Sequence, residues 1–249
     1  MRVWWTLWKR ELASMLISPV AYIMTTMFLV VLGLGFWSIA SYRLTSGASA
    51  YEVLRGLYGG VAWFAVIMVI PVLTMRSLAE EKRSGTLETL LTAPVTDWAV
   101  VLSKFFGLLT VYALMWAPTL AYGPILNHIN AEPIYFDAGA LIGAYLGIML
   151  VGAFMLSVGL LCSALTRNLI VASISTFAVI GSFFLFGFLP EVSPAPWLRD
   201  LSRPFSPVLH MLDFSRGLID TRPVVLYVSG TVFMLVATVR VLDARRWRS

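Results

Sequence analysis

The sequence predicts an all-α polytopic membrane protein with six transmembrane helices, an N-terminal interfacial helix and short external re-entrant helices before the last span. Three observations predict this fold. Of the 249 residues, 59% are hydrophobic and only 12% are charged, whereas a soluble domain usually carries about 25% charged residues. The mean hydropathy is +0.84. Long stretches also lack charge altogether, and a helix needs about 20 apolar residues to cross the hydrocarbon core of a bilayer.

Each of six charge-free stretches is long enough to hold one span. No Asp, Glu, Lys or Arg occurs in 12–42, 56–75, 105–131, 138–166, 168–190 or 223–239. We predict a single transmembrane domain over 19–249, with spans near 19–40, 57–75, 105–126, 140–162, 169–189 and 223–240. Pro71 is tolerable near the end of the second span, because neighbouring helices and waters can satisfy the carbonyl that it frees.

The basic residues predict the orientation. Six spans put both termini on one side, and of the 18 Lys and Arg residues, twelve fall on that side and six on the other. The positive-inside rule therefore predicts cytoplasmic termini in a plasma (inner) membrane. The formal net charge of +5 fits lipid headgroups as partners and not nucleic acid, because the cations flank apolar runs.

Residues 1–18 are predicted to form an amphipathic helix in the headgroup plane. Trp4, Trp8, Leu12 and Leu16 recur every four residues, with polar residues largely opposite, which is typical of an interfacial helix. The predicted membrane-interface anchors are Trp4, Trp5, Trp8, Lys9 and Arg10. The alternative is an extended N-terminus with an aromatic anchor.

The loop 76–104 is short and dense in charge, and it holds a compact apolar patch. Thr86 is a plausible N-cap for a short helix over 87–92, which Pro94 ends, and Thr96 can cap the next span. A short helix held between two long ones suits contact with a soluble partner. An ordinary solvated loop is the alternative, and these residues alone do not decide between the two.

Before the last span, the external segment 190–222 is rich in proline and too apolar for a free loop. Two short helical stretches are expected around 197–201 and 207–216, the second of them stopped by Gly217. A simple surface cap is one interpretation of these stretches, and short helices that dip toward the membrane, which the family resemblance given below implies for this position, are the other.

Two motifs resemble a known family. The first has Pro71, Thr74, Met75, Arg76, Ala79, Glu80, Glu81, Lys82, Gly85, Thr86, Glu88, Leu91, Pro94 and Lys104, and the second has Ser206, Pro207, His210, Phe214, Gly217 and Asp220. The chain resembles the ABC-2 type transporter permeases, and in particular the gliding-motility and nitrous-oxide-reductase maturation permeases. The resemblance covers essentially the whole chain, although between the motifs only the hydropathy matches.

The resemblance implies a homodimer, or a heterodimer with a related permease, that carries two ABC ATP-binding subunits. Residues 1–18 would be the family's connecting helix, and 84–94 the coupling helix that seats in the ATPase. The implied contacts with the ATPase subunit are Glu80, Glu81, Arg83, Gly85, Thr86, Leu87, Glu88, Leu90, Leu91 and Pro94. The implied external gate consists of Pro207, His210, Phe214, Gly217 and Asp220.

Several chemistries lack their residues in this sequence. There is no GxxxxGK loop followed by Ser or Thr, so ATP and Mg are expected on a partner subunit, and this chain is expected to be no enzyme and to hold no cofactor. No metal site is expected, because His128 and His210 each lack a second ligand at helical spacing. Cys162 is alone, inside an apolar run, which indicates a buried packing residue.

The spans carry packing signals and no charge. Gly139, Gly143 and Gly147 let helices approach closely, more often within one subunit than between two. Ion-coupled carriers usually keep ionisable residues inside the bundle, so the energy for transport is expected from outside the membrane. Because the resemblance is to exporters and no import-type cytoplasmic signature is evident, the prediction is an ABC permease that acts as an exporter. The alternatives are a membrane-embedded enzyme acting on lipids and a non-transporting scaffold that an ATPase drives mechanically.

Overall fold

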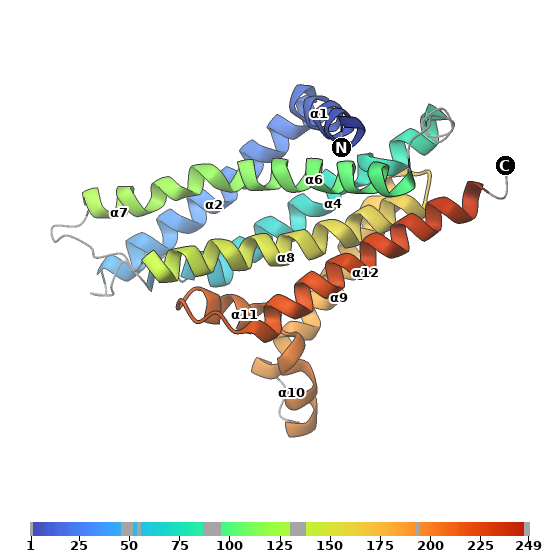
Figure 1. The fold of residues 1–249 in the computed structure, drawn as a ribbon. Coiled ribbons are helices and arrows are strands. Elements are labelled where there is room, and N and C mark those ends of the chain that lie inside the picture. The colour runs from blue at the N-terminus through green and yellow to red at the C-terminus, as the bar shows by residue number, and fades with distance from the viewer. Residues whose placement is uncertain are drawn as a thin grey trace.

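The computed structural model describes residues 2–45, 52–53, 56–86, 96–129, 138–192 and 195–246. All regular structure in these ranges is helical, and six helices are long and apolar enough to cross a membrane. Figure 1 shows the resulting bundle. The prediction of an all-α polytopic membrane protein is confirmed.

The helices follow one another as α1 (Arg2–Ile17), α2 (Pro19–Thr45), the π-helix η1 (Leu57–Val61), α4 (Ala62–Ser84), α6 (Asp97–Trp116), the 3₁₀ helix η2 (Ala117–Ala121), α7 (Tyr122–Ile129), α8 (Ala138–Leu165), α9 (Leu169–Val192), α10 (Pro196–Ser202), the 3₁₀ helix η3 (Arg203–Phe205), α11 (Pro207–Phe214) and α12 (Thr221–Arg246). The candidate spans are Pro19–Tyr42, Leu57–Ser84, Asp97–Leu126, Gly139–Leu165, Leu169–Pro190 and Thr221–Ala244. Each of them overlaps one of the charge-free stretches.

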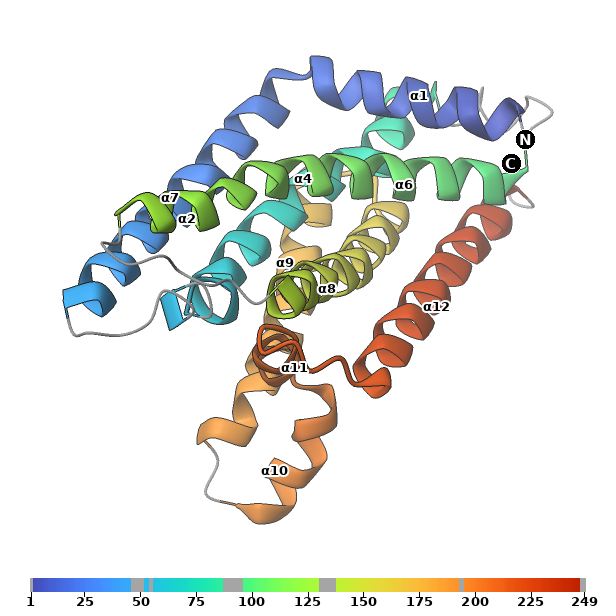
Figure 2. The ribbon, with the colours of Figure 1, turned by 60° about the vertical axis from the view of Figure 1, so that its left-hand side comes forward.

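Helix α8 lies at the centre of the bundle. Helices α4, α6, α9, α11 and α12 all pack against it (Figures 1 and 2). The spans that contain α4, α6 and α8 are more than half buried within the molecule, whereas those of α2, α9 and α12 are mostly exposed. The three exposed helices carry large apolar side chains on their outer faces, as helices in contact with lipid do.

Glycines on α8 allow this close packing, because each faces a side chain of a different neighbour. A Cβ atom on Gly152 would collide with the Tyr112 ring of α6, and one on Gly159 would collide with Thr74 of α4. Small residues at such points let helix backbones approach. Gly152 and Gly159 therefore have the packing role, further along α8, that the sequence predicts for the glycines at its start.

The first part of the segment between the second and third spans is helical, whereas the sequence predicted a loop there. Residues 76–84 continue α4 as helix, and the helix ends at Gly85, which has φ 73° in the left-handed region. The prediction of a loop from residue 76 is therefore wrong for 76–84. Helix-forming residues run without a break up to Gly85, which can adopt the left-handed conformation at no steric cost.

Helix α1 is formed, but it packs on the bundle. Figure 2 shows it running alongside α6, and the ring centroids of Trp4 and Phe106 of α6 are 5.8 Å apart in an edge-to-face arrangement. Leu12 and Met15 pack against the core, whereas Leu16 is exposed. The buried face of α1 therefore includes Met15 in place of Leu16, and it packs against α6.

Both termini lie at one end of the bundle. Figure 2 shows the start of α1, the start of α6 and the end of α12 on the same side of the molecule. Helices α7 and α11 lie toward the other end (Figure 1).

Candidate functional site

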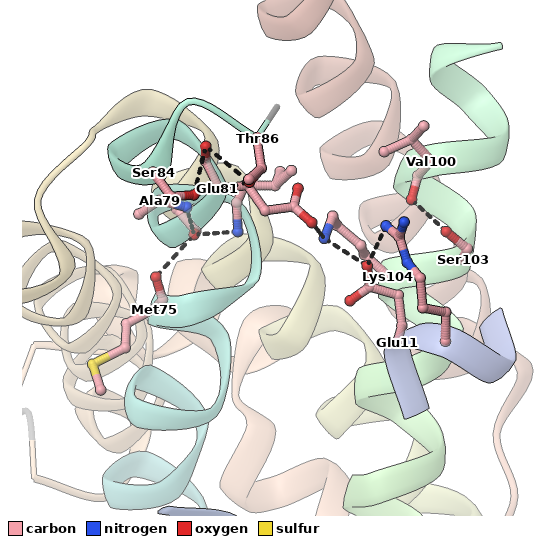
Figure 3. Close-up of polar contacts among 12 residues, drawn as sticks. Glu11, Met75, Ala79, Glu81, Ser84, Thr86, Val100, Ser103 and Lys104 are labelled. Atoms are coloured by element: carbon pink, nitrogen blue, oxygen red, sulfur yellow. Dashed lines mark hydrogen bonds and ion pairs between the residues drawn. The ribbon is translucent and has the colours of Figure 1, made fainter. Parts of the chain in front are cut away.

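The end of the bundle with the termini holds a buried ion pair network centred on Lys104. This side chain leaves α6 one residue before a charge-free stretch begins, and it is 1% exposed. Its Nζ donates to Glu11 Oε1 of α1 at 2.9 Å and to Glu81 Oε1 of α4 at 2.7 Å. Figure 3 shows Lys104 between the two carboxylates. One ammonium therefore joins three helices.

The charges in this network balance. Arg10 Nη2 lies 3.7 Å from Glu11 Oε1, so two cations, Arg10 and Lys104, face two anions, Glu11 and Glu81. A buried charge without a partner is costly, and a buried pair from which one partner is removed loses about 3–5 kcal/mol. The network therefore fixes the position of α1 on α6 and α4.

A second set of contacts joins α4 to the last turn of α8. Ser163 Oγ lies within hydrogen-bond distance of three backbone groups: it accepts from Leu78 N at 3.0 Å and Ala79 N at 2.9 Å, and it donates to Met75 O at 3.2 Å. Lys82 Nζ donates to Ala164 O, and a cation is favourable beside the carbonyls at a helix C-terminus.

Arg76 joins the same part of α4 to the link between α1 and α2. Its Nε and Nη2 donate to the Glu80 carboxylate at 2.7 and 3.0 Å, which is a bidentate pair, and its Nη1 donates to Ser18 Oγ at 3.0 Å. We call these contacts together the polar junction, made of Arg10, Glu11, Ser18, Arg76, Glu80, Glu81, Lys82, Lys104 and Ser163. It connects α1, α2, α4, α6 and α8 at one end of the bundle.

The polar junction borders the predicted coupling segment. At the start of this segment, the chain ends α4 at Gly85, and Ser84 Oγ lies 2.8 Å from Thr86 Oγ1. The chain enters α6 at Thr96, whose hydroxyl accepts from Ala99 N at 3.3 Å, so this predicted cap is confirmed. Leu87, Glu88, Leu90, Leu91 and Pro94 of the predicted segment lie outside the described residues.

The remaining predicted ATPase contacts divide into two kinds. Arg83, Gly85 and Thr86 are exposed, whereas Glu80 and Glu81 bind Arg76 and Lys104 within the chain. Sequence reasoning missed the roles of Glu11, Lys104 and Ser163. The first two had a signal, since each borders a charge-free stretch where a lone charge must lie close to the apolar core.

The predicted interface anchors form an aromatic group on α1. Trp5 and Trp8 stack with ring centroids 4.7 Å apart, Trp4 stacks on Trp8 at 6.5 Å, and Lys9 Nζ lies 5.1 Å from the Trp5 centroid. Trp5, Lys9 and Arg10 are exposed, whereas Trp4 and Trp8 are half-buried.

At the other end of the bundle, the predicted gate segment is packed onto α8 and α9. The structure has α10 and α11 where short helices were expected, and Ser206 caps α11 by accepting from Leu209 N at 3.3 Å while donating to Gly187 O at 2.6 Å. Pro207 is buried beside Gly187. Asp220 Oδ1 accepts from Arg222 N at 3.1 Å at the start of α12.

Helix α11 packs directly on the predicted glycine series of α8. A Cβ on Gly143 would collide with the backbone oxygen of Phe214, and one on Gly147 would lie 2.8 Å from the Phe214 ring. Gly217, with φ 76°, turns the chain beside Gly139. These glycines therefore pack within the chain.

His210 is the buried histidine of this segment. Its Nδ1 lies 2.9 Å from the Tyr227 hydroxyl oxygen. Burial lowers the pKa of His210, and the nearby Asp213 and Asp220 carboxylates offset this only in part. His128 is exposed, and within the described ranges no three His, Cys, Asp or Glu residues gather in a way that could hold a metal ion.

These features define a multi-pass α-helical membrane protein with a polar junction at one end. The comparisons identify its family: residues 38–239 match the model of the ABC-2 family transporter protein family. The chain belongs to this family.

Two curated relatives are similar to part of the chain. Both carry the name "Probable multidrug ABC transporter permease YbhR", one from Escherichia coli strain K12 and one from Escherichia coli O157:H7. Each is 30% identical over 164 residues, which cover 62% of this chain and 43% of the relative. The expected resemblance to ABC-2 permeases is confirmed, whereas the finer resemblance to gliding-motility and nitrous-oxide-reductase maturation permeases stays a prediction.

Proposed function

We propose that this chain is the membrane-spanning permease subunit of an ABC transporter and that a separate ATP-binding subunit supplies the energy. The observation that carries the proposal is the polar junction, which in a member of a transporter family joins five helices next to the segment between α4 and α6. A force applied to that segment reaches α1 and α6 through Lys104 and α8 through Ser163.

The proposed mechanism is a shift between two packings of the spans. ATP binding changes the equilibrium only as far as the ATPase binds one packing better than the other. Because protein interiors are close-packed, helices joined in this way move as rigid bodies. The continuous helix from the membrane span to Ser84 makes α4 a lever for such motion.

The wider assembly is part of the proposal. The excess of cations on one side supports cytoplasmic termini in the plasma membrane, and ATP with Mg would bind to the partner subunit. The permease would act as an exporter, as a homodimer or with a related permease. The printed name of the relatives, a probable multidrug permease, supports an amphipathic cargo.

A pair of charge reversals tests where the ATPase binds. Arg83 in the last turn of α4 and Arg167 between α8 and α9 are both exposed, but only Arg83 lies next to the predicted coupling segment. With the chain co-expressed with its ATP-binding subunit, Arg83→Glu should weaken copurification and transport-coupled ATP hydrolysis by about tenfold, because a charge opposed across an interface costs binding energy. Arg167→Glu is the matched control.

The two variants give opposite readings of the proposal. Loss of the ATPase with Arg83→Glu and retention with Arg167→Glu supports the assignment. Equal binding by both variants, or a stronger loss with Arg167→Glu, contradicts it.

A further inference from the structure

A cavity of about 750 Å³ opens beside the polar junction, between α1, the start of α2, the end of α4 and the start of α6. This is the size of a pocket that holds an organic ligand. Its charged wall consists of Arg10, Glu11, Arg76, Glu80, Glu81 and Lys104. Its apolar wall consists of Met15, Val20, Ala21, Met24, Val72 and Leu73.

The charged wall is electrically neutral. It holds three cations and three carboxylates, so it offers both signs of charge to a ligand and has no net attraction for an anion. A headgroup with one phosphate and one ammonium matches such a wall, because the phosphate can face arginine and the ammonium can face glutamate.

The apolar wall lies at the boundary of the membrane. Val20, Ala21 and Met24 open the candidate span Pro19–Tyr42, and Val72 and Leu73 precede the charged end of the candidate span Leu57–Ser84. A ligand that fills the whole cavity therefore has its polar part among charges and its apolar part at the depth where acyl chains begin. Few soluble metabolites have that division, whereas a phospholipid does.

Glu80 is the most accessible carboxylate of this wall. Its side chain is 44% exposed, against 12% for Glu11 and 21% for Glu81. A primary ammonium brings three donors to such a carboxylate, which a quaternary ammonium cannot do.

We propose that this cavity binds a zwitterionic glycerophospholipid with a primary ammonium headgroup, taken from the leaflet at the end of the bundle that carries both termini. The ammonium binds beside Glu80 and the phosphate beside Arg76, and one acyl chain follows α2. The bound lipid fills the angle between α1 and α4 and thereby supports the polar junction. This inference rests on the membrane placement of the chain and is independent of the proposed ATPase.

The test uses the chain purified without an ATPase in nanodiscs that contain equal parts of phosphatidylethanolamine, phosphatidylcholine and phosphatidylglycerol, with native mass spectrometry of the lipid that stays bound. The wild-type chain should retain phosphatidylethanolamine in preference to the other two lipids. Ala21→Trp fills the apolar wall and should lower this retention about tenfold, which corresponds to about 1.4 kcal/mol. Ile23→Trp on the exposed face of the same helix is the matched control and should bind as the wild type does.

A charge variant tests the headgroup separately and needs no change in cavity volume. Glu80→Gln leaves the wall with a net charge of +1, so the preference should move from phosphatidylethanolamine to phosphatidylglycerol. The proposal fails if Ala21→Trp and Ile23→Trp retain equal amounts, if Glu80→Gln leaves the preference unchanged, or if free phosphoethanolamine displaces the lipid at equal concentration. The last outcome would mean that the apolar wall contributes nothing.

Discussion

The two ends of this bundle are held together by different interactions. At the end with the termini, Lys104 is buried between Glu11 and Glu81, and hydrogen bonds join α4 to α8. At the other end, α11 rests on glycines of α8, with no side chain between Phe214 and Gly143. The ion pairs join α1, α4 and α6 so that these helices can move as one unit, whereas the close-packed contact at the other end has no free volume for motion. The difference suits an input of motion at the charged end and a firm support at the packed end.

The largest expected effect is at the charged end. Lys104→Met leaves Glu11 and Glu81 facing each other without their cation, and it should lower the free energy of unfolding by about 3–5 kcal/mol. Thermal or denaturant unfolding in detergent measures this loss. Adding Glu11→Gln and Glu81→Gln should recover most of it, because a neutral replacement of a buried ion network is often close to neutral in stability.

The other end supplies the control for this prediction. Arg216 and Asp213 form a pair at 3.9 Å, with side chains 46% and 53% exposed, and exposed pairs contribute about 0–1 kcal/mol. Arg216→Met should therefore change stability by less than about 1 kcal/mol. If Lys104→Met costs no more than Arg216→Met, the network around Lys104 is not the tie that joins the three helices.

The next effect is at the packed end. Gly143→Ala places a methyl group against the backbone oxygen of Phe214, and a backbone atom cannot move aside as a flexible side chain can. Overpacking of this kind costs about 1–3 kcal/mol. Gly181→Ala in α9 is the control, because a Cβ there has no neighbour within 4 Å, and alanine is the better helix former. Unfolding in detergent should show a loss for the first variant and none for the second; equal behaviour would mean that α11 does not need this glycine.

Much of the fold could be predicted because a bilayer restricts the amino-acid composition of the segments that cross it. Spans must be apolar throughout, so charge-free stretches mark them, and the short helices of 190–222 follow from proline and Gly217, which act locally on the backbone. The charge of residues 76–84 predicts a loop, although nothing in these residues stops a helix before Gly85.

The polar junction could not be predicted in the same way, because its residues belong to different helices and come together only in the folded bundle. Glu11 and Lys104 are 93 residues apart, and Glu81 is 23 residues from Lys104. No spacing in the sequence shows that one ammonium will have two carboxylates from different helices. The apolar stripe of α1 indicates that one face of this helix is buried, but it does not indicate whether lipid or α6 covers that face.

The smallest expected effect is a pH dependence confined to the packed end. The pKa of His210 lies below its usual 6.5 because the ring is buried, so the unfolded chain takes up this proton at a higher pH than the folded chain does. Stability from this residue is constant above about pH 6.5 and falls as the pH drops from there through the folded value. His210→Gln keeps a hydrogen-bonding side chain near Tyr227 and removes the proton, so the slope of stability against pH should flatten between pH 6.5 and 5. His128→Gln, at an exposed position, should leave the slope in place. A steeper fall in the His210→Gln chain would show that protonation of His210 stabilises this end, against the burial seen here.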